Sequence, residues 1–136
     1  MIRGTYILSA IAACVVATTA AMAEAIVETR TLLKDGTVVI DTSEITTDVK
    51  GYRDVTPIKL YLKDGVVSKV ELQPNRETPT IFQKIVDANL SQRWVGLSTK
   101  KASTAKVDAI SGATISSKAI IANVQRAAKF ELENGE

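Results

Sequence analysis

The sequence predicts an α+β domain in which helices pack on a mainly antiparallel sheet. The tetrapeptide Leu-Lys-Asp-Gly occurs twice, at residues 33–36 and 62–65, and each copy stands between two β-rich runs. Helical patterns follow in the second half of the chain, from residue 79 and again near the C-terminus, and we expect one or two further strands among them. Strands followed by helices are typical of this fold class.

The N-terminus has the composition of a signal peptide. Arg3 supplies a positive charge, and an uncharged run of apolar or small residues extends from residue 6 to residue 21. The triplet Ala-Met-Ala at 21–23 fits the small-residue pattern of a cleavage site. We therefore expect a signal peptide over residues 1–23 and a single domain over residues 24–136, in the periplasm or elsewhere outside the cytoplasm.

Two alternatives concern the same segment. The tetrapeptide Ile-Ala-Ala-Cys at 11–14 resembles a bacterial lipobox, in which Cys14 would be lipidated, although apolar residues follow it where a polar tether is usual. The apolar run is also close to the lower length limit of an uncleaved membrane anchor. Either alternative would attach the protein to a membrane, and all three place the folded domain outside the cytoplasm.

The composition of residues 24–136 excludes several kinds of site. This part of the chain contains no His and no Cys, because the only Cys is Cys14. Zinc sites built from His and Cys, disulfides, iron–sulfur clusters and catalytic triads with a His base are therefore excluded. The formal net charge of the whole chain is only +2, so no strong field attracts nucleic acid. Hydroxyl, carboxylate and amine groups remain for chemistry.

The second Leu-Lys-Asp-Gly copy predicts a hairpin whose register follows from its alternating apolar residues. A two-residue loop at Asp64-Gly65 would place apolar residues opposite polar ones. A three-residue loop over 63–65 would instead pair Leu62 with Val66 and Ile58 with Val70. We therefore predict the three-residue loop.

Two helices are predicted after the strands. Thr78 fits an N-cap and Pro79 the first helical position, and an apolar stripe then continues to about Leu90. The polar, lysine-rich run 98–106 is predicted to be a loop, and residues 131–136 are expected to fray. The last helix follows residue 113. Its apolar face is Ile120, Ile121, Val124, Ala127 and Ala128, and its expected solvent face is Lys118, Gln125, Arg126 and Lys129.

The segment Ser111-Gly112-Ala113-Thr114 precedes this helix. A flexible backbone at a helix N-terminus presents unpaired N–H groups and the positive end of the helix dipole, which together favour an anion such as phosphate. The alternative is an ordinary helix start, in which Ser111 is the N-cap and Thr114 is a solvated residue of the first turn. Spacing alone favours this alternative.

The longer pattern Asp108-x-x-Ser111-Gly112-Ala113-Thr114-x-Ser116-Ser117 resembles the signature of the FMN-binding domain family. This family includes the flavin subunits of the sodium-pumping NADH:quinone oxidoreductase and of the related Rnf complex. The resemblance implies that Thr114 carries FMN through a phosphoester bond. It also implies that Asp108, Ser111, Gly112 and Ala113 belong to the cofactor-binding segment.

Further agreement lies upstream, so that the similarity covers about residues 51–128. Gly51-Tyr52, Pro57-Ile58, Asp64-Gly65 and Glu77-Thr78-Pro79 occur in the order expected of the family, although Thr80 stands where Gly is usual. The resemblance brings forward Tyr52, Glu77 and Thr78 as neighbours of the flavin ring. The alternative for Glu77 is an exposed carboxylate.

A few other residues are candidates because of their type or scarcity. Trp94, the only Trp, is a further candidate neighbour of the ring, and core packing is its favoured alternative. Lys100, Lys101 and Lys106 could approach the phosphate, although solvated loop lysines are the simpler interpretation. Tyr61 is expected to be a strand-surface residue.

The function implied is that of an exported electron-transfer flavoprotein with covalent FMN. It would relay electrons between a membrane donor and another exported redox protein, and would be a carrier rather than a stand-alone enzyme. A Thr hydroxyl is a poor nucleophile without an activating base. Family resemblance therefore implies a separate, metal-dependent FAD:protein FMN transferase as a partner. The alternatives are a flavin-free exported adaptor or lipoprotein and a hydrolase that uses Ser111 or Ser117.

Overall fold

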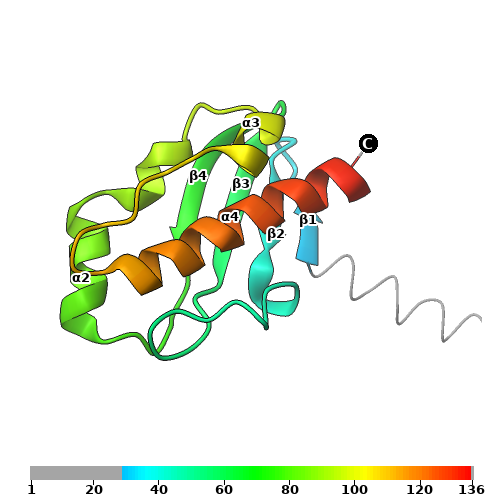
Figure 1. The fold of residues 1–136 in the computed structure, drawn as a ribbon. Coiled ribbons are helices and arrows are strands. Elements are labelled where there is room, and N and C mark those ends of the chain that lie inside the picture. Colours follow the sequence, from blue (N-terminus) through cyan, green and yellow to red (C-terminus); the bar gives the residue numbers. More distant parts are fainter. Residues whose placement is uncertain (1–28, 136) are drawn as a thin grey trace, which may run out of the picture.

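The computed structural model describes residues 29–135, which form one antiparallel sheet with helices on one of its faces (Figure 1). The sheet has four strands in the order β1-β2-β3-β4, and the predicted α+β class is confirmed. The strands are β1 Arg30–Leu32, β2 Val38–Asp41, β3 Ile58–Lys63 and β4 Val66–Leu72. The helices are α2 Pro79–Asp87, α3 Thr99–Thr104 and α4 Thr114–Asn134, with 3-10 turns η1 Thr42–Glu44 and η2 Leu90–Trp94.

Both Leu-Lys-Asp-Gly copies form hairpins, but the predicted three-residue loop is wrong for the second copy. Lys63 pairs with Val66, which leaves Asp64 and Gly65 alone in the loop. Their φ angles are 52° and 73°, and this left-handed pair is typical of the tight hairpin turns that match the twist of a sheet.

A β-bulge explains why the two-residue loop does not mix the faces. Leu62 pairs with Val67, whereas the preceding residue Tyr61 pairs with Lys69, so Ser68 is an extra residue in β4. Beyond the bulge the pairs are Leu60–Val70 and Ile58–Leu72, and apolar residues meet again. Val67 is therefore 1% exposed and Val66 is 39% exposed, the reverse of the predicted register.

The segment before α3 forms hydrogen bonds with β4 that stabilise the bulged register. Val67 N donates a hydrogen bond to Leu97 O (2.8 Å), and Gly96 N donates to Val67 O (2.8 Å). Residues 98–106 were predicted to be a loop, and this is wrong because α3 begins within them. Ser98 Oγ caps α3 by accepting from Lys101 N (3.2 Å), and Ala102 is fully buried. No strand follows β4 in residues 73–135, so the expected final strands are not found there.

Helix α2 starts as predicted at Pro79, with Thr78 at the N-cap position, but it ends at Asp87 rather than near Leu90. Asn89 has a φ of 54°, and this left-handed residue separates α2 from η2. Helix α4 extends to Asn134, further than the predicted fraying suggests. Glu131 near its end accepts hydrogen bonds from Arg30 of β1 (2.8 and 3.0 Å).

Helix α4 lies across the sheet and supplies one wall of the core (Figure 1). Ile120, Val124, Ala127 and Ala128 are fully buried, as predicted, whereas Ile121 is only partly buried. Lys118 and Lys129 are exposed, as predicted. Gln125 and Arg126 were expected in solvent but are half-buried. Gln125 Nε2 donates to Ala105 O (3.3 Å), and Arg126 pairs with Asp48.

A buried polar contact joins α4 to η1. Asn123 is fully buried, and its Oδ1 accepts hydrogen bonds from the hydroxyls of Thr42 (2.6 Å) and Thr46 (2.6 Å). Thr42 Oγ1 also accepts from Ile58 N (2.9 Å). Because an unpaired polar group in this position would be costly, these bonds fix where α4 lies on the sheet.

The predicted signal peptide over residues 1–23 and the lipobox at Cys14 lie outside the described residues. Within residues 29–135, no helix has both the length and the apolar character that crossing a membrane requires.

We predict that Val67→Ala lowers the free energy of unfolding by about 1–3 kcal/mol, because it opens a cavity in the core. Val66→Ala on the exposed side should change it by no more than about 0.5 kcal/mol. Chemical denaturation of the two variants measures both values. The reverse order would support the three-residue loop and contradict the bulge.

Candidate functional site

The turn before α4 is held tightly by the helix that follows it. Ala113 N donates to Ile110 O (2.9 Å), and Gly112 has a φ of +79°, a conformation that favours glycine. Ser117 is fully buried, and its hydroxyl donates to Ala113 O (2.7 Å) and accepts from Ile110 N (3.1 Å). Ser117 is therefore a structural residue, which removes it as a hydrolase nucleophile.

The first turn of α4 has no side-chain cap. The N-cap is Ala113 rather than Ser111, and no acidic residue lies in the first turn. The N–H groups of residues 114–116 therefore lack intrahelical acceptors, and the helix dipole adds partial positive charge. Thr114 is the first helical residue, and its side chain is exposed. An exposed hydroxyl thus stands at a helix end that favours an anion.

Glu77 connects this helix start with the loop after residue 50. It is only 5% exposed, and its carboxylate accepts hydrogen bonds from Tyr52 N (2.6 Å), Arg53 N (2.7 Å) and Ser116 Oγ (2.6 Å). A Cβ on Gly51 would lie 1.9 Å from Glu77 Oε1, so only glycine fits there. The alternative that Glu77 is an exposed carboxylate is wrong.

Burial and these hydrogen bonds shift the pKa of the Glu77 carboxyl group in opposite directions. Burial on its own would raise the pKa of the carboxyl group. The hydrogen bonds from Ser116, Arg53 and Tyr52 stabilise the charged form and outweigh burial, so the pKa lies below its ordinary value. Glu77 is therefore a carboxylate at neutral pH.

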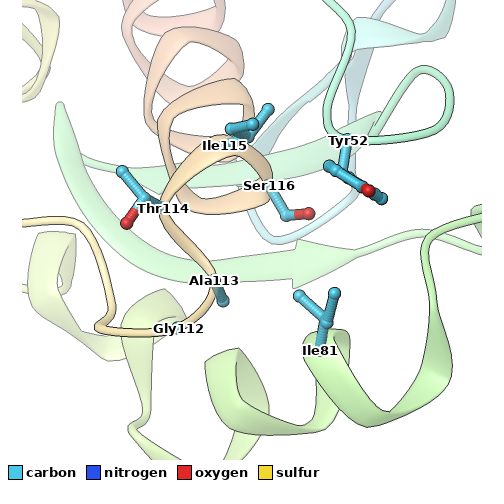
Figure 2. A pocket seen from close by; sticks show the side chains of 7 residues that line it. All are labelled: Tyr52, Ile81, Gly112, Ala113, Thr114, Ile115 and Ser116. Carbon is cyan, nitrogen blue, oxygen red and sulfur yellow. The ribbon is translucent and has the colours of Figure 1, made fainter.

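A cavity of about 310 Å³ opens beside the helix start (Figure 2). Tyr52, which is 62% exposed, faces it from the loop that Glu77 holds, and Ile81 faces it from α2. Thr114 lies at the edge of the cavity, on the side away from Tyr52 (Figure 2). The lining residues are Tyr52, Ile81, Gly112, Ala113, Thr114, Ile115 and Ser116.

The structure brings some of the predicted site residues together and leaves others outside. Tyr52 and residues 112–114 line the cavity, and Glu77 lies behind it. Ser111 is exposed in the turn. Thr78 begins α2 and is not among the lining residues. Asp108 is exposed before the turn, where Arg93 Nη1 donates to its backbone oxygen (3.1 Å).

Other candidates lie elsewhere. Trp94 is fully buried in the core, which confirms the packing alternative and excludes contact with a ligand in the cavity. Lys100 and Lys101 belong to α3, and the chain just after α3 contacts Gln125 in the middle of α4, away from its start (Figure 1). Tyr61 lies on β3 with Lys69 Nζ 5.3 Å from its ring centre, as expected of a strand-surface residue.

Four residues of the site were not among the predicted site residues, although Ser116 belongs to the family pattern. Ile81 and Ile115 line the cavity, and Ser116 joins it to Glu77. Lys84 of α2 lies against the turn, since a Cβ on Gly112 would be 2.7 Å from its Nζ. Only the helical spacing from Pro79 could have indicated that Ile81 and Lys84 share one side of α2.

The arrangement suits a ligand with a flat aromatic part and an anionic part. Tyr52, Ile81 and Ile115 offer an aromatic and aliphatic surface, and the uncapped start of α4 offers N–H groups. The absence of a side chain on Gly112 lets Lys84 of α2 lie against the turn.

We predict that Glu77→Gln lowers the free energy of unfolding at neutral pH by about 1–3 kcal/mol, because an amide cannot accept from all three donors. The charged form of Glu77 is the one that the fold stabilises. Its contribution is therefore present above the ordinary pKa of 4.5 and is lost as the pH falls through the lowered pKa.

Below pH 4.5 the stability of the wild type should therefore fall more steeply with decreasing pH than that of Glu77→Gln. Denaturant titrations across this range measure both slopes. Glu71→Gln is the matched control, because within residues 29–135 the Glu71 carboxylate makes a single ion pair, with Lys69 at the surface (3.5 Å). Equal slopes for the wild type and Glu77→Gln would contradict the assigned hydrogen bonds.

Comparisons with known proteins agree with this geometry. A search of curated proteins and a search of solved structures gave no significant match. A family model described as the FMN-binding domain matches residues 51–129, which include Tyr52, Glu77 and the whole turn before α4. The match covers more than half of the chain, and it supports FMN as the cofactor. The chain belongs to the FMN-binding domain family.

Proposed function

We propose that this protein is an exported electron carrier whose FMN is bound covalently to Thr114. The observation that carries the proposal is the exposed Thr114 hydroxyl at the uncapped start of α4, beside a cavity with aromatic and aliphatic walls. The flavin, when bound, supplies the redox chemistry. The chain supplies the attachment site, orients the cofactor and covers part of the flavin ring.

The attachment step follows from the linkage. Thr114 Oγ attacks the flavin-side phosphorus of FAD, an oxygen–phosphorus bond forms and the pyrophosphate bond breaks. AMP leaves, and the hydroxyl proton passes to a base. The chain contains no His, and Thr114 Oγ has no hydrogen-bond partner among residues 29–135 that could activate it. A partner enzyme, an FAD:protein FMN transferase, is therefore part of the proposal.

Ser111, Gly112 and Asp108 fit the role of the segment that this transferase recognises. All three are exposed in the segment before Thr114, and the backbone between them is fixed by Arg93 and Ser117. A rigid, exposed segment can enter the active site of a second protein with little loss of conformational entropy.

Transport of electrons between a membrane donor and another exported redox protein fits the remaining features. The signal-peptide pattern at residues 1–23 favours export, and a covalent bond keeps the cofactor where a dissociated one would be lost. Tyr52 and Ile115 are 62% and 52% exposed at the cavity, so a partner could approach a ring held there.

We predict that the protein from a host with the transferase is heavier than its polypeptide by one FMN minus one water. Thr114→Val should remove this added mass, since valine has no hydroxyl. Thr104→Val, which alters an exposed hydroxyl at the end of α3, should retain it. Intact mass spectrometry and flavin fluorescence after denaturation measure the result. A flavin retained by Thr114→Val would contradict the site, and a bare wild-type polypeptide would favour the flavin-free adaptor.

We also predict that Gly112→Ala slows flavin attachment. Gly112 and Gly36 both have positive φ, at +79° and +90°, so alanine at either position should cost about 1–2 kcal/mol of stability. Only Gly112 borders the cavity and Lys84, so Gly36→Ala is a control for the loss of stability alone. The rate of mass increase in the presence of transferase and FAD distinguishes them, and equal rates would contradict a role for the turn.

A further inference from the structure

Lys84 extends from α2 across the turn that precedes Thr114. Measured from the Cβ position of Gly112, Lys84 Nζ lies at 2.7 Å, Cδ at 3.4 Å and Cε at 3.6 Å. The aliphatic stem therefore lies over Gly112 and brings the ammonium group to the turn. A side chain at position 112 would occupy this space. Lys84 can therefore lie over the turn because residue 112 is glycine.

The ammonium group of Lys84 has no hydrogen bond or ion pair with any residue in the described range 29–135. The nearest acidic residue along α2 is Asp87, which accepts from Gln83 Nε2 (2.8 Å). The first turn of α4 contains no acidic residue either. Positive charge from Lys84 and from the helix dipole thus meets at the turn. The carboxylate of Glu77 reaches the first turn of α4 through Ser116, but it accepts from Ser116, Tyr52 N and Arg53 N rather than from Lys84.

We infer that Lys84 is the positioning residue for the phosphodiester on Thr114, a role that rests on the proposed covalent attachment of FMN. A phosphodiester keeps one negative charge, and an ammonium group is a suitable point-charge partner for it. Thr114 is two residues after Gly112, so the ester oxygen starts within the reach of this side chain. Lys84 would hold the phosphate at the turn and orient the rest of the cofactor towards the cavity.

Lys118 is the competing cation. It lies four residues after Thr114, on the same side of α4, and helical side chains lean towards the N-terminus. Like Lys84 it is exposed, but the three atoms nearest to the Cβ position of Gly112 all belong to Lys84. The test must therefore tell Lys84 from Lys118.

Lysine acetylation of the wild-type protein provides this test without a substitution. Flavin-free protein from a host without the transferase and flavinylated protein from a host with it are treated with an acetylating reagent, and the rate at each lysine is read by peptide mass spectrometry. Lys84 should react about two- to fivefold more slowly in the flavinylated protein, the range expected for a partly exposed ion pair. Lys129, at the other end of α4, should react at the same rate in both forms.

Each alternative result has a distinct meaning. Equal rates at Lys84 in the two forms would overturn its role while leaving the covalent flavin intact. Slowing at Lys118 alone would assign the role to that residue instead. Absence of the added FMN mass in the second preparation would contradict the proposed function itself, and intact mass shows this before any acetylation.

Thermal unfolding of variants supplies a second readout. Flavinylation should raise the melting temperature less in Lys84→Gln than in Lys129→Gln at low salt, and the difference should shrink at high salt. The melting temperature of each variant is compared with that of its own flavin-free form. Any effect of the substitution on the stability of the flavin-free protein therefore cancels. Equal increments in the two variants would overturn the proposal.

Discussion

The carboxylate of Glu77 is the interaction on which the site depends. It receives hydrogen bonds from two backbone N–H groups of the loop after Gly51 and from the Ser116 hydroxyl of α4. Three segments that are distant in sequence therefore meet at one buried charge. Without it, two amides and a hydroxyl would lose their acceptor, and Tyr52 would no longer be held at the cavity.

A second buried polar contact keeps α4 itself in place. Asn123, two turns after Ser116, accepts from Thr42 and Thr46, and Thr42 is tied to the start of β3. The helix is thus fixed at its first turn by Glu77 and in its middle by η1. A helix held at two points by directional bonds cannot rotate or slide on its apolar face, so the exposed position of Thr114 is determined by the core.

Local patterns in the sequence predicted local features well. The strand–turn–strand units, the start of α2 at Pro79 and the buried face of α4 all follow from spacing and turn chemistry. The bulge at Ser68 could not be predicted in this way, because it depends on pairing between Val67 and residues 96–97. The same holds for α3, whose polar sequence is helical because Ser98 caps it and Ala102 packs inside. In the site, the family motif indicated Thr114 and Glu77. Lys84 and Ile81 come from another helix, and their helical spacing places them on one side of α2 but does not show that this side faces the turn before α4.

The cluster of small hydroxyl residues at the start of α4 now has a physical explanation. Ser116 gives its hydroxyl to Glu77, and Ser117 uses its own to close the preceding turn. Both side chains are buried, whereas Thr114 is exposed and makes no hydrogen bond within residues 29–135. Three neighbouring hydroxyls are chemically similar, yet the fold leaves a single one accessible. Access therefore distinguishes Thr114 from Ser116 and Ser117, whose hydroxyls the fold uses for its own hydrogen bonds. Ser111 is also exposed, so the proposed modifying enzyme would tell it from Thr114 by their positions, in the turn and at the first residue of α4.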